Sequence, residues 1–205
     1  MIILMIGIKK ERKMSREAIL NSIRKNKPEI LPLPEIIEEN FEESVNLIET
    51  FKSNIILVGG AVKEISEENI DFTIRDNYPS KKSIVTTTKK SNLGTIKVNV
   101  NTDPHHLETI DLAIIEGDLG VAENGAIWIT ADKSIVRALP FITNDLVLIL
   151  DKTKICLHMI DAYKELAKRE RNFGVFISGP SKTADIEQCL VVGAHGAISL
   201  TVLLI

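Results

Sequence analysis

The sequence predicts an α/β fold: a mainly parallel sheet flanked by helices, with a helical segment at the N-terminus. Its 205 residues are enough for one substantial core. Several continuous apolar runs have the length and the β-branched content of strands that are buried on both faces, as in parallel sheets. Segments with helical periodicity separate these runs, which is the pattern of α/β proteins.

The N-terminal region is expected to lie outside this fold. Residues 1–13 join a short apolar run to a basic cluster. The apolar run is too short to cross a bilayer, which takes about 20 residues, and its charges follow it, whereas a secretory signal places them first. We therefore expect residues 1–13 to be a disordered extension. Residues 14–35 should form a helix capped by Ser15 and a proline-rich linker.

The α/β domain is predicted to occupy residues 36–205. Apolar residues spaced by three and four positions predict a helix over residues 36–52. The apolar run at residues 55–58 ends in two glycines and is predicted to be a buried strand. Further strands are expected at residues 83–87, 111–115, 146–150, 173–177 and 198–205, and helices at residues 66–75 and 154–171.

A hairpin is predicted around Asn124-Gly125, because this dipeptide between alternating apolar residues favours a two-residue turn. The strands would be residues 119–123 and 126–130. Glu123 would then stand at a strand end beside the turn. A carboxylate there can act as a base or a nucleophile if it is buried, although an exposed acid is the commoner outcome at a turn.

The segment from residue 178 to residue 188 has the pattern of a tight loop that opens a helix. Gly179 can adopt backbone angles closed to other residues, and Ser181 or Thr183 can cap the first helical N–H groups. Such an end attracts anions, and Lys182 strengthens the attraction. The same residue types also form ordinary turns, so a ligand site and a plain turn both remain open.

Of the four histidines, His195 is the candidate for proton transfer or anion binding. It lies in a glycine-flanked turn, where a side chain can point into a cleft with little crowding, and a structural hydrogen bond remains an equal alternative. His105 and His106 are adjacent and point apart, so no metal site is expected. His158 is expected to be structural or exposed.

Composition excludes several classes of function. The net charge of -3 and the aromatic content of 4% do not indicate nucleic-acid binding. The sequence contains two cysteines, Cys156 and Cys189, and two thiolates cannot supply a four-cysteine iron-sulfur cluster. No disulfide framework or membrane span is expected, so a cytoplasmic location is the better expectation.

Three blocks resemble the lactate-utilisation protein C family, whose members are LUD-domain proteins. The blocks are residues 120–125, residues 178–187 and residues 193–196, in family order and spacing. The resemblance implies a fold like that of CoA transferases, sugar-phosphate isomerases and formyltetrahydrofolate cyclo-ligase. It also implies a non-redox subunit in the oxidation of L-lactate to pyruvate, with iron-sulfur clusters on partner proteins and no cofactor in this chain.

Two functional hypotheses follow. In the first, the chain is an accessory subunit that holds a small anion or a partner. In the second, it is a stand-alone enzyme of the CoA-transferase or cyclo-ligase kind, in which Glu123 attacks an acyl group or the loop binds phosphate. Glu123 and His195 are the catalytic candidates. The ligand-binding candidates are Asn124, Gly125, Ser178, Gly179, Pro180, Ser181, Lys182, Thr183, Asp185 and Gly196. We expect these segments to meet at one edge of the sheet, where ligand clefts of α/β proteins form.

Overall fold

A computed structural model describes residues 15–32, 34, 37, 44–170, 172–184, 190–193 and 195–205. The chain divides into two compact units, residues 1–43 and residues 44–205. The predicted extension at residues 1–13 lies outside the described residues. In the smaller unit, helix α1 (Arg16–Lys25) begins as predicted, because the hydroxyl oxygen of Ser15 accepts a hydrogen bond from the N–H of Ala18 at 3.2 Å.

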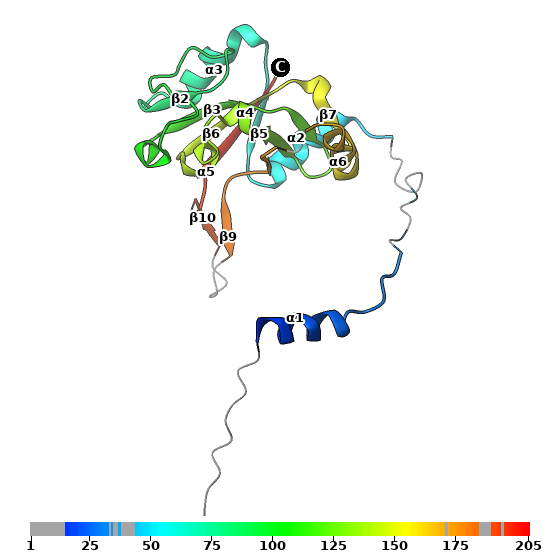
Figure 1. Ribbon diagram of the computed structural model, residues 1–205. Helices are drawn as coiled ribbons and strands as arrows, with labels where there is room; N and C mark the ends of the chain where they lie inside the picture. Colours follow the sequence, from blue (N-terminus) through cyan, green and yellow to red (C-terminus); the bar gives the residue numbers. More distant parts are fainter. Residues whose placement is uncertain are drawn as a thin grey trace, which may run out of the picture. The chain divides into compact units, whose positions relative to one another are not determined.

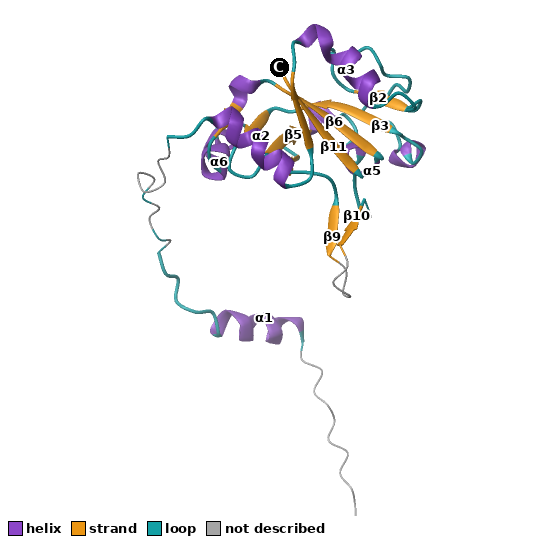
Figure 2. Ribbon diagram, turned by 180° about the vertical axis from the view of Figure 1, so that it is seen from behind, coloured by secondary structure: helices purple, strands orange, loops and turns teal. Residues whose placement is uncertain are grey.

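The larger unit is organised around a five-stranded parallel sheet in the order β1-β11-β6-β3-β2. Figure 1 and Figure 2 show this sheet from opposite sides. Its strands are β1 (Ala61–Glu64), β2 (Ile84–Thr86), β3 (Leu112–Glu116), β6 (Asp145–Leu150) and β11 (Ser199–Leu204). The predicted strands at residues 83–87, 111–115, 146–150 and 198–205 are therefore confirmed. The last of them lies inside the sheet, between β1 and β6.

Of the first two elements predicted for the α/β domain, the helix is confirmed over residues 47–52, and the strand at residues 55–58 was wrong. Residues 44–46 are not helical; helix α2 runs from Leu47 to Leu57 and includes most of the predicted strand at residues 55–58. Phe51 and Ile55, four positions apart, are fully buried, whereas Leu57 is 80% exposed. One face of a helix is therefore buried, where a central strand would bury both faces. The strand in this region is β1, which follows the two glycines.

A second, four-stranded sheet has the order β7-β4-β5-β8. Its strands are β7 (Ile155–Cys156), β4 (Leu119–Val121), β5 (Ala126–Thr130) and β8 (Gly174–Ile177). The predicted hairpin is present, but Val121 pairs with Ala126, so the connection has four residues. The predicted helix at residues 154–171 is shorter, α6 (Met159–Ala167), because its first residues form β7.

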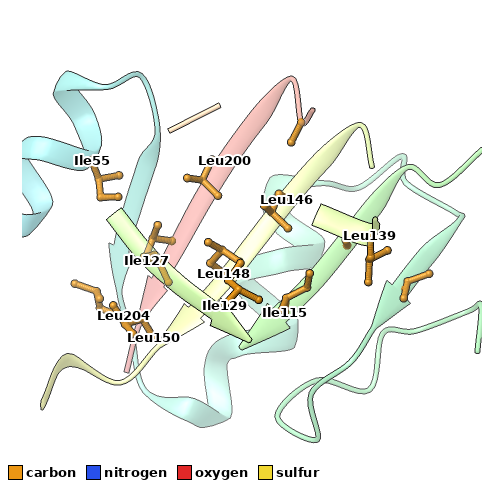
Figure 3. Packing of buried hydrophobic residues seen from close by; sticks show 14 of the residues in the cluster. Ile55, Ile115, Ile127, Ile129, Leu139, Leu146, Leu148, Leu150, Leu200 and Leu204 are labelled. Carbon is orange, nitrogen blue, oxygen red and sulfur yellow. The ribbon is translucent and has the colours of Figure 1, made fainter. Parts of the chain in front are cut away.

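The two sheets pack face to face through apolar side chains. Ile127 and Ile129 of β5 meet residues of β6 and β11 in one buried cluster, which Figure 3 shows from close by. Leu148, at the centre of this cluster, is 0% exposed. Trimming such a residue to alanine typically costs about 2–5 kcal/mol of stability. The sheet-on-sheet contact is thus the main stabilising core of the larger unit.

Helices cover the remaining faces. Helix α3 (Ile70–Asn77), preceded by the 3-10 turn η2 (Glu67–Asn69), packs Ile70 and Ile74 on the other face of the parallel sheet. Helix α6 packs Ala162 on the outer face of the second sheet. The remaining short elements are α4 (Ala131–Ser134), α5 (Leu139–Ile142), η3 (Pro104–Leu107) and η4 (Lys152–Lys154). No helix in the described part of the chain is long and apolar enough to cross a bilayer.

A small hairpin of β9 (Lys182–Ala184) and β10 (Leu190–Val192) projects from the larger unit (Figures 1 and 2). The sequence predicted a helix starting at Ser181 or Thr183, and this prediction was wrong. Thr183 instead pairs with Val191 across the two strands. Hydrogen bonds between the strands therefore replace those of a helical first turn.

Candidate functional site

The turn that carries Glu123, residues 122–125, is held against helix α2. The side-chain amide of Asn54 donates to the carbonyl oxygen of Ala122 at 2.7 Å. Gly125 has a φ of +66°, and a Cβ at this position would lie 3.0 Å from the backbone nitrogen of Ile55. Glycine is thus favoured both by the left-handed backbone and by the close approach of the helix. The turn gives Glu123 a defined position.

Glu123 forms a pair with His158, the N-cap residue of α6. The carboxylate Oε2 lies 2.8 Å from Nδ1 of His158, and Oε1 accepts the N–H of Met159 at 2.9 Å. Asp161 completes a capping box by accepting the N–H of His158 at 3.2 Å. A carboxylate at the start of a helix is stabilised by the free N–H groups and by the helix dipole. Glu123 is therefore part of the N-terminal cap of α6 as well as a histidine partner.

The Glu123–His158 pair has the geometry of a proton-transfer pair. The two side chains are 36% and 23% exposed, so solutes can approach them. In the tautomer whose Nδ1–H donates this hydrogen bond to the carboxylate, Nε2 carries the lone pair of the neutral ring. This hydrogen bond orients the imidazole as a carboxylate does in known histidine catalysts.

The sequence did not predict that His158 would be the partner of Glu123. A signal was present, because His158 is followed three positions later by Asp161, the spacing of a capping box. His195, the predicted catalytic histidine, is exposed. No contact between His195 and Glu123 is found within the described ranges.

The loop at residues 178–182, called here the 178 loop, lies against the Glu123 turn. The hydroxyl of Ser178 donates to the carbonyl oxygen of Asn124 at 2.7 Å. Gly179 is buried with a φ of +74°, and a Cβ there would lie 2.6 Å from the carbonyl oxygen of Val58. Only glycine fits this contact without a shift of the backbone. The loop is therefore closely packed on the end of α2.

The ammonium group of Lys182 donates to the carbonyl oxygen of Val58, the C-cap residue of α2. A cation at a helix C-terminus interacts favourably with the free carbonyl groups and the dipole. The expected anion site depended on a helix N-terminus after Ser181, and strand β9 stands there instead. The neighbouring helix end is a C-terminus, which does not attract anions. The sequence argument for an anion at this loop thus loses its physical basis.

The far end of the 178 loop contacts the turn that carries Gly196. The N–H of Ser181 donates to the carbonyl oxygen of Ala197 at 2.8 Å, and the N–H of Gly193 donates to the carbonyl oxygen of Ser181 at 3.0 Å. A Cβ at Gly196 would lie 3.1 Å from Cβ of Ser181. The loop therefore joins the Glu123 turn to the Gly196 turn. Pro180 and Thr183 belong to the same segment, and Asp185 lies outside the described residues.

This cluster sits at the amino ends of the parallel strands, because β1 and β11 begin directly after it. The expected ligand cleft of an α/β sheet lies outside the carboxyl ends.

Cys156, on the strand before His158, is half-buried. Its burial and the nearby Asp161 carboxylate raise the pKa of this thiol to about 11. It is protonated at neutral pH and is a poor nucleophile or metal ligand. No cluster of possible metal ligands occurs in the described regions.

A solved structure shares this fold. The crystal structure of a duf162 family protein from Deinococcus radiodurans matches with a TM-score of 0.61 and 15% identity, over 77% of this chain and 95% of that chain. The class is thus an α/β domain with this pair of sheets. Residues 11–205 match the LUD domain, and the chain belongs to the LUD-domain family, as the three sequence blocks predicted.

Several relatives are named lactate utilization protein C. The protein of that name from Oceanobacillus iheyensis is 30% identical over 105 residues, which are 48% of this chain and 45% of the relative. The one from Bacillus pumilus is 35% identical over 99 residues, 45% of this chain and 41% of the relative. The one from Geobacillus kaustophilus is 27% identical over 137 residues, which are 64% of this chain and 54% of the relative. The chain thus spans roughly half the length of the curated relatives it matches.

Proposed function

We propose that this chain acts in lactate utilisation, as a non-redox subunit of a cytoplasmic system that oxidises L-lactate to pyruvate. The observation that carries the proposal is the similarity to several proteins named lactate utilization protein C, on a chain of the LUD-domain family. Iron-sulfur proteins are the proposed partners.

The chemistry of the reaction supports a division of labour. Oxidation of the lactate CH–OH group to a ketone releases two electrons and two protons. The cysteine content of this chain does not provide a four-thiolate cluster, so the electrons would pass to clusters on the partner proteins. The Glu123–His158 pair would accept a proton, because a positioned histidine is the side chain that most often serves as a general base.

Genetic complementation tests the role in lactate metabolism. A strain that lacks this chain should grow on glucose but fail on L-lactate as the carbon source, and the intact gene should restore growth. Glu123→Gln should restore growth poorly, because a neutral amide cannot accept a proton. Glu108→Gln, the same change at an exposed glutamate outside the site, serves as the matched control. Normal growth of the deletion strain on L-lactate would reject the proposal.

Affinity purification tests the partners. The tagged full chain, purified under anaerobic conditions from lactate-grown cells, should bring down proteins whose iron and acid-labile sulfide are present in equal amounts. Cells grown on glucose provide the control. Purification of the chain without iron at both carbon sources would reject the iron-sulfur partners and leave the growth result to decide the metabolic role.

A stand-alone enzyme of the CoA-transferase kind is the second candidate. It is favoured by the partial exposure of the Glu123 carboxylate beside the backbone N–H of Met159. A cyclo-ligase-like phosphate site is disfavoured, because Lys182 is engaged by the Val58 carbonyl group. In this candidate the Glu123 carboxylate attacks the acyl carbonyl of an acyl-CoA, the thioester bond breaks and the CoA thiolate leaves. The resulting acyl-glutamate anhydride should be trapped by hydroxylamine in the wild type and be absent in Glu123→Gln. Failure to trap it with acetyl-CoA and lactate would reject this candidate.

A further inference from the structure

A groove at the edge of the larger unit is separate from the candidate site. It has a volume of about 560 Å³ and lies between the end of α3, the start of β2 and the loop of residues 92–95. Figures 1 and 2 both show α3 beside β2. Helix α3 covers the face of the parallel sheet opposite the second sheet, which carries Glu123. The groove therefore shares no wall with the Glu123–His158 pair.

The floor of the groove is apolar. Ile74 and Leu93 are buried at 1% and 7% exposure, and Ile84 packs against them. The rim is polar and carries Arg75, Lys81 and Asn92. Ligand pockets in proteins commonly have about 300–1,000 Å³ and combine an apolar lining with a few polar groups. The volume and the lining both match a small-molecule site.

The two cations of the rim differ in their partners. Lys81 pairs with the Asp145 carboxylate at 2.6 Å, and this hydrogen bond raises the pKa of Lys81. Arg75, in the last turn of α3, is exposed and forms no ion pair or hydrogen bond with any residue that the structure describes. The Asp71 carboxylate, on the same helix, accepts the N–H of Asn92 at 3.2 Å. The Arg75 guanidinium is therefore the cation of the rim that is open to a ligand among the described residues.

We propose that this groove binds a small organic anion with an apolar ring, such as an aromatic phosphate or carboxylate. The ring would lie against Ile84 and Leu93, which line the groove. The anionic group would take the guanidinium of Arg75, whose planar fork matches the oxygens of carboxylates and phosphates. The side-chain amide of Asn92 would supply a further donor at the rim. This assignment is independent of lactate oxidation, because no residue of the Glu123 turn takes part.

Titration of the full chain with phenyl phosphate, followed by 1H–15N NMR, tests the proposal. The amide signals of Arg75, Leu93 and Gly94 should shift and saturate. Arg75→Gln should raise the dissociation constant about tenfold or more, as for loss of a charge-assisted hydrogen bond. Asn92→Trp, which fills the groove with an indole, should abolish the shifts. Arg24→Gln, in α1, removes an exposed arginine outside the groove and should bind as the wild type does.

Each component of the probe provides a decisive comparison. Inorganic phosphate alone and phenol alone should each produce weaker shifts at these amides than phenyl phosphate. Equal shifts with inorganic phosphate would show an anion patch without an apolar subsite, and equal shifts with phenol would show an apolar subsite without the arginine. Either result would overturn the assignment, as would shifts that persist unchanged in Arg75→Gln.

Discussion

The Glu123 turn and the 178 loop both follow strands of the second sheet, and they meet at the hydrogen bond from Ser178 to Asn124. Charged side chains dominate the first segment, where the carboxylate of Glu123 binds His158 and the start of α6. Backbone geometry dominates the second, where a buried glycine touches the end of α2. The two segments therefore have different roles. The turn presents the polar side chains that could react, and the loop holds the turn in position.

The largest effect is expected from Gly179→Ala, because the new Cβ would meet the Val58 carbonyl oxygen in a left-handed backbone. The variant should lose about 3 kcal/mol of unfolding free energy, or about 6–12 °C in Tm by calorimetry. Gly59→Ala is the matched control, since its φ of +86° is similar but its nearest neighbour would be 3.5 Å away. It should lose about 1 kcal/mol. Equal losses would show that backbone conformation alone, and not the contact with α2, supports the loop.

A double-mutant cycle sharpens the view of the Glu123 turn. Glu123→Ala, His158→Ala and the double variant should give a coupling energy of about 1 kcal/mol in urea unfolding, the size expected of a partly exposed pair. Each single change should also impair growth on L-lactate as much as the double change, because the two groups act as one unit. Additive effects on growth would indicate that the two side chains work separately.

Ser178→Ala tests the link between the two segments. The variant loses the hydrogen bond to the Asn124 carbonyl group, which should cost about 1 kcal/mol, or about 2–4 °C in Tm. Ser53→Ala, at an exposed position of α2, should lose no stability. If the loop supports the turn, growth on L-lactate should fall in Ser178→Ala and remain normal in Ser53→Ala. Normal growth of both variants would show that the turn holds Glu123 without the loop.

The smallest effect is expected at Glu64, a carboxylate at the carboxyl end of β1 that serves as a reference remote from both segments. Hydrogen bonds from Lys152 and Lys52 lower the pKa of Glu64 from 4.5 to about 2. A lowered pKa stabilises the folded state above the unfolded value of 4.5, and this stabilisation is lost as the pH falls toward about 2. Glu64→Gln should therefore reduce the pH dependence of stability between these values, measured by urea unfolding. An unchanged pH profile would contradict the assignment of this interaction.

Strand positions were predictable wherever burial was complete. The runs that became β3, β6 and β11 are largely apolar, because both faces of these central strands are covered, and Thr201 is a polar residue inside β11. The run at residues 55–58 has the same composition, yet it belongs to a helix. A short apolar run does not distinguish a buried strand from one turn of a helix, and only the packing of Phe51 and Ile55 on the core decides between them.

The sequence predicted the turn and the loop of the candidate site, and it did not predict the contact between Glu123 and His158. Small and hydroxylated residues marked the 178 loop, and Asn124-Gly125 marked the turn. The partner of Glu123 is set by the position of β7 beside β4, which places His158 next to a residue 35 positions earlier. The capping-box spacing of His158 and Asp161 marks a helix start, and it carries no information about a contact with Glu123.

The amino-acid sequence by itself determined the α/β class, the LUD-domain family and the turns around Glu123 and Gly179. These follow from apolar periodicity and from the backbone freedom of glycine, which are local properties. The tertiary structure alone decided that the segment after Ser181 is a strand, that Lys182 binds the end of α2 and that His158 is paired with Glu123. Each of these outcomes depends on which distant groups are close enough to satisfy a polar atom, and that is settled only when the two sheets pack together.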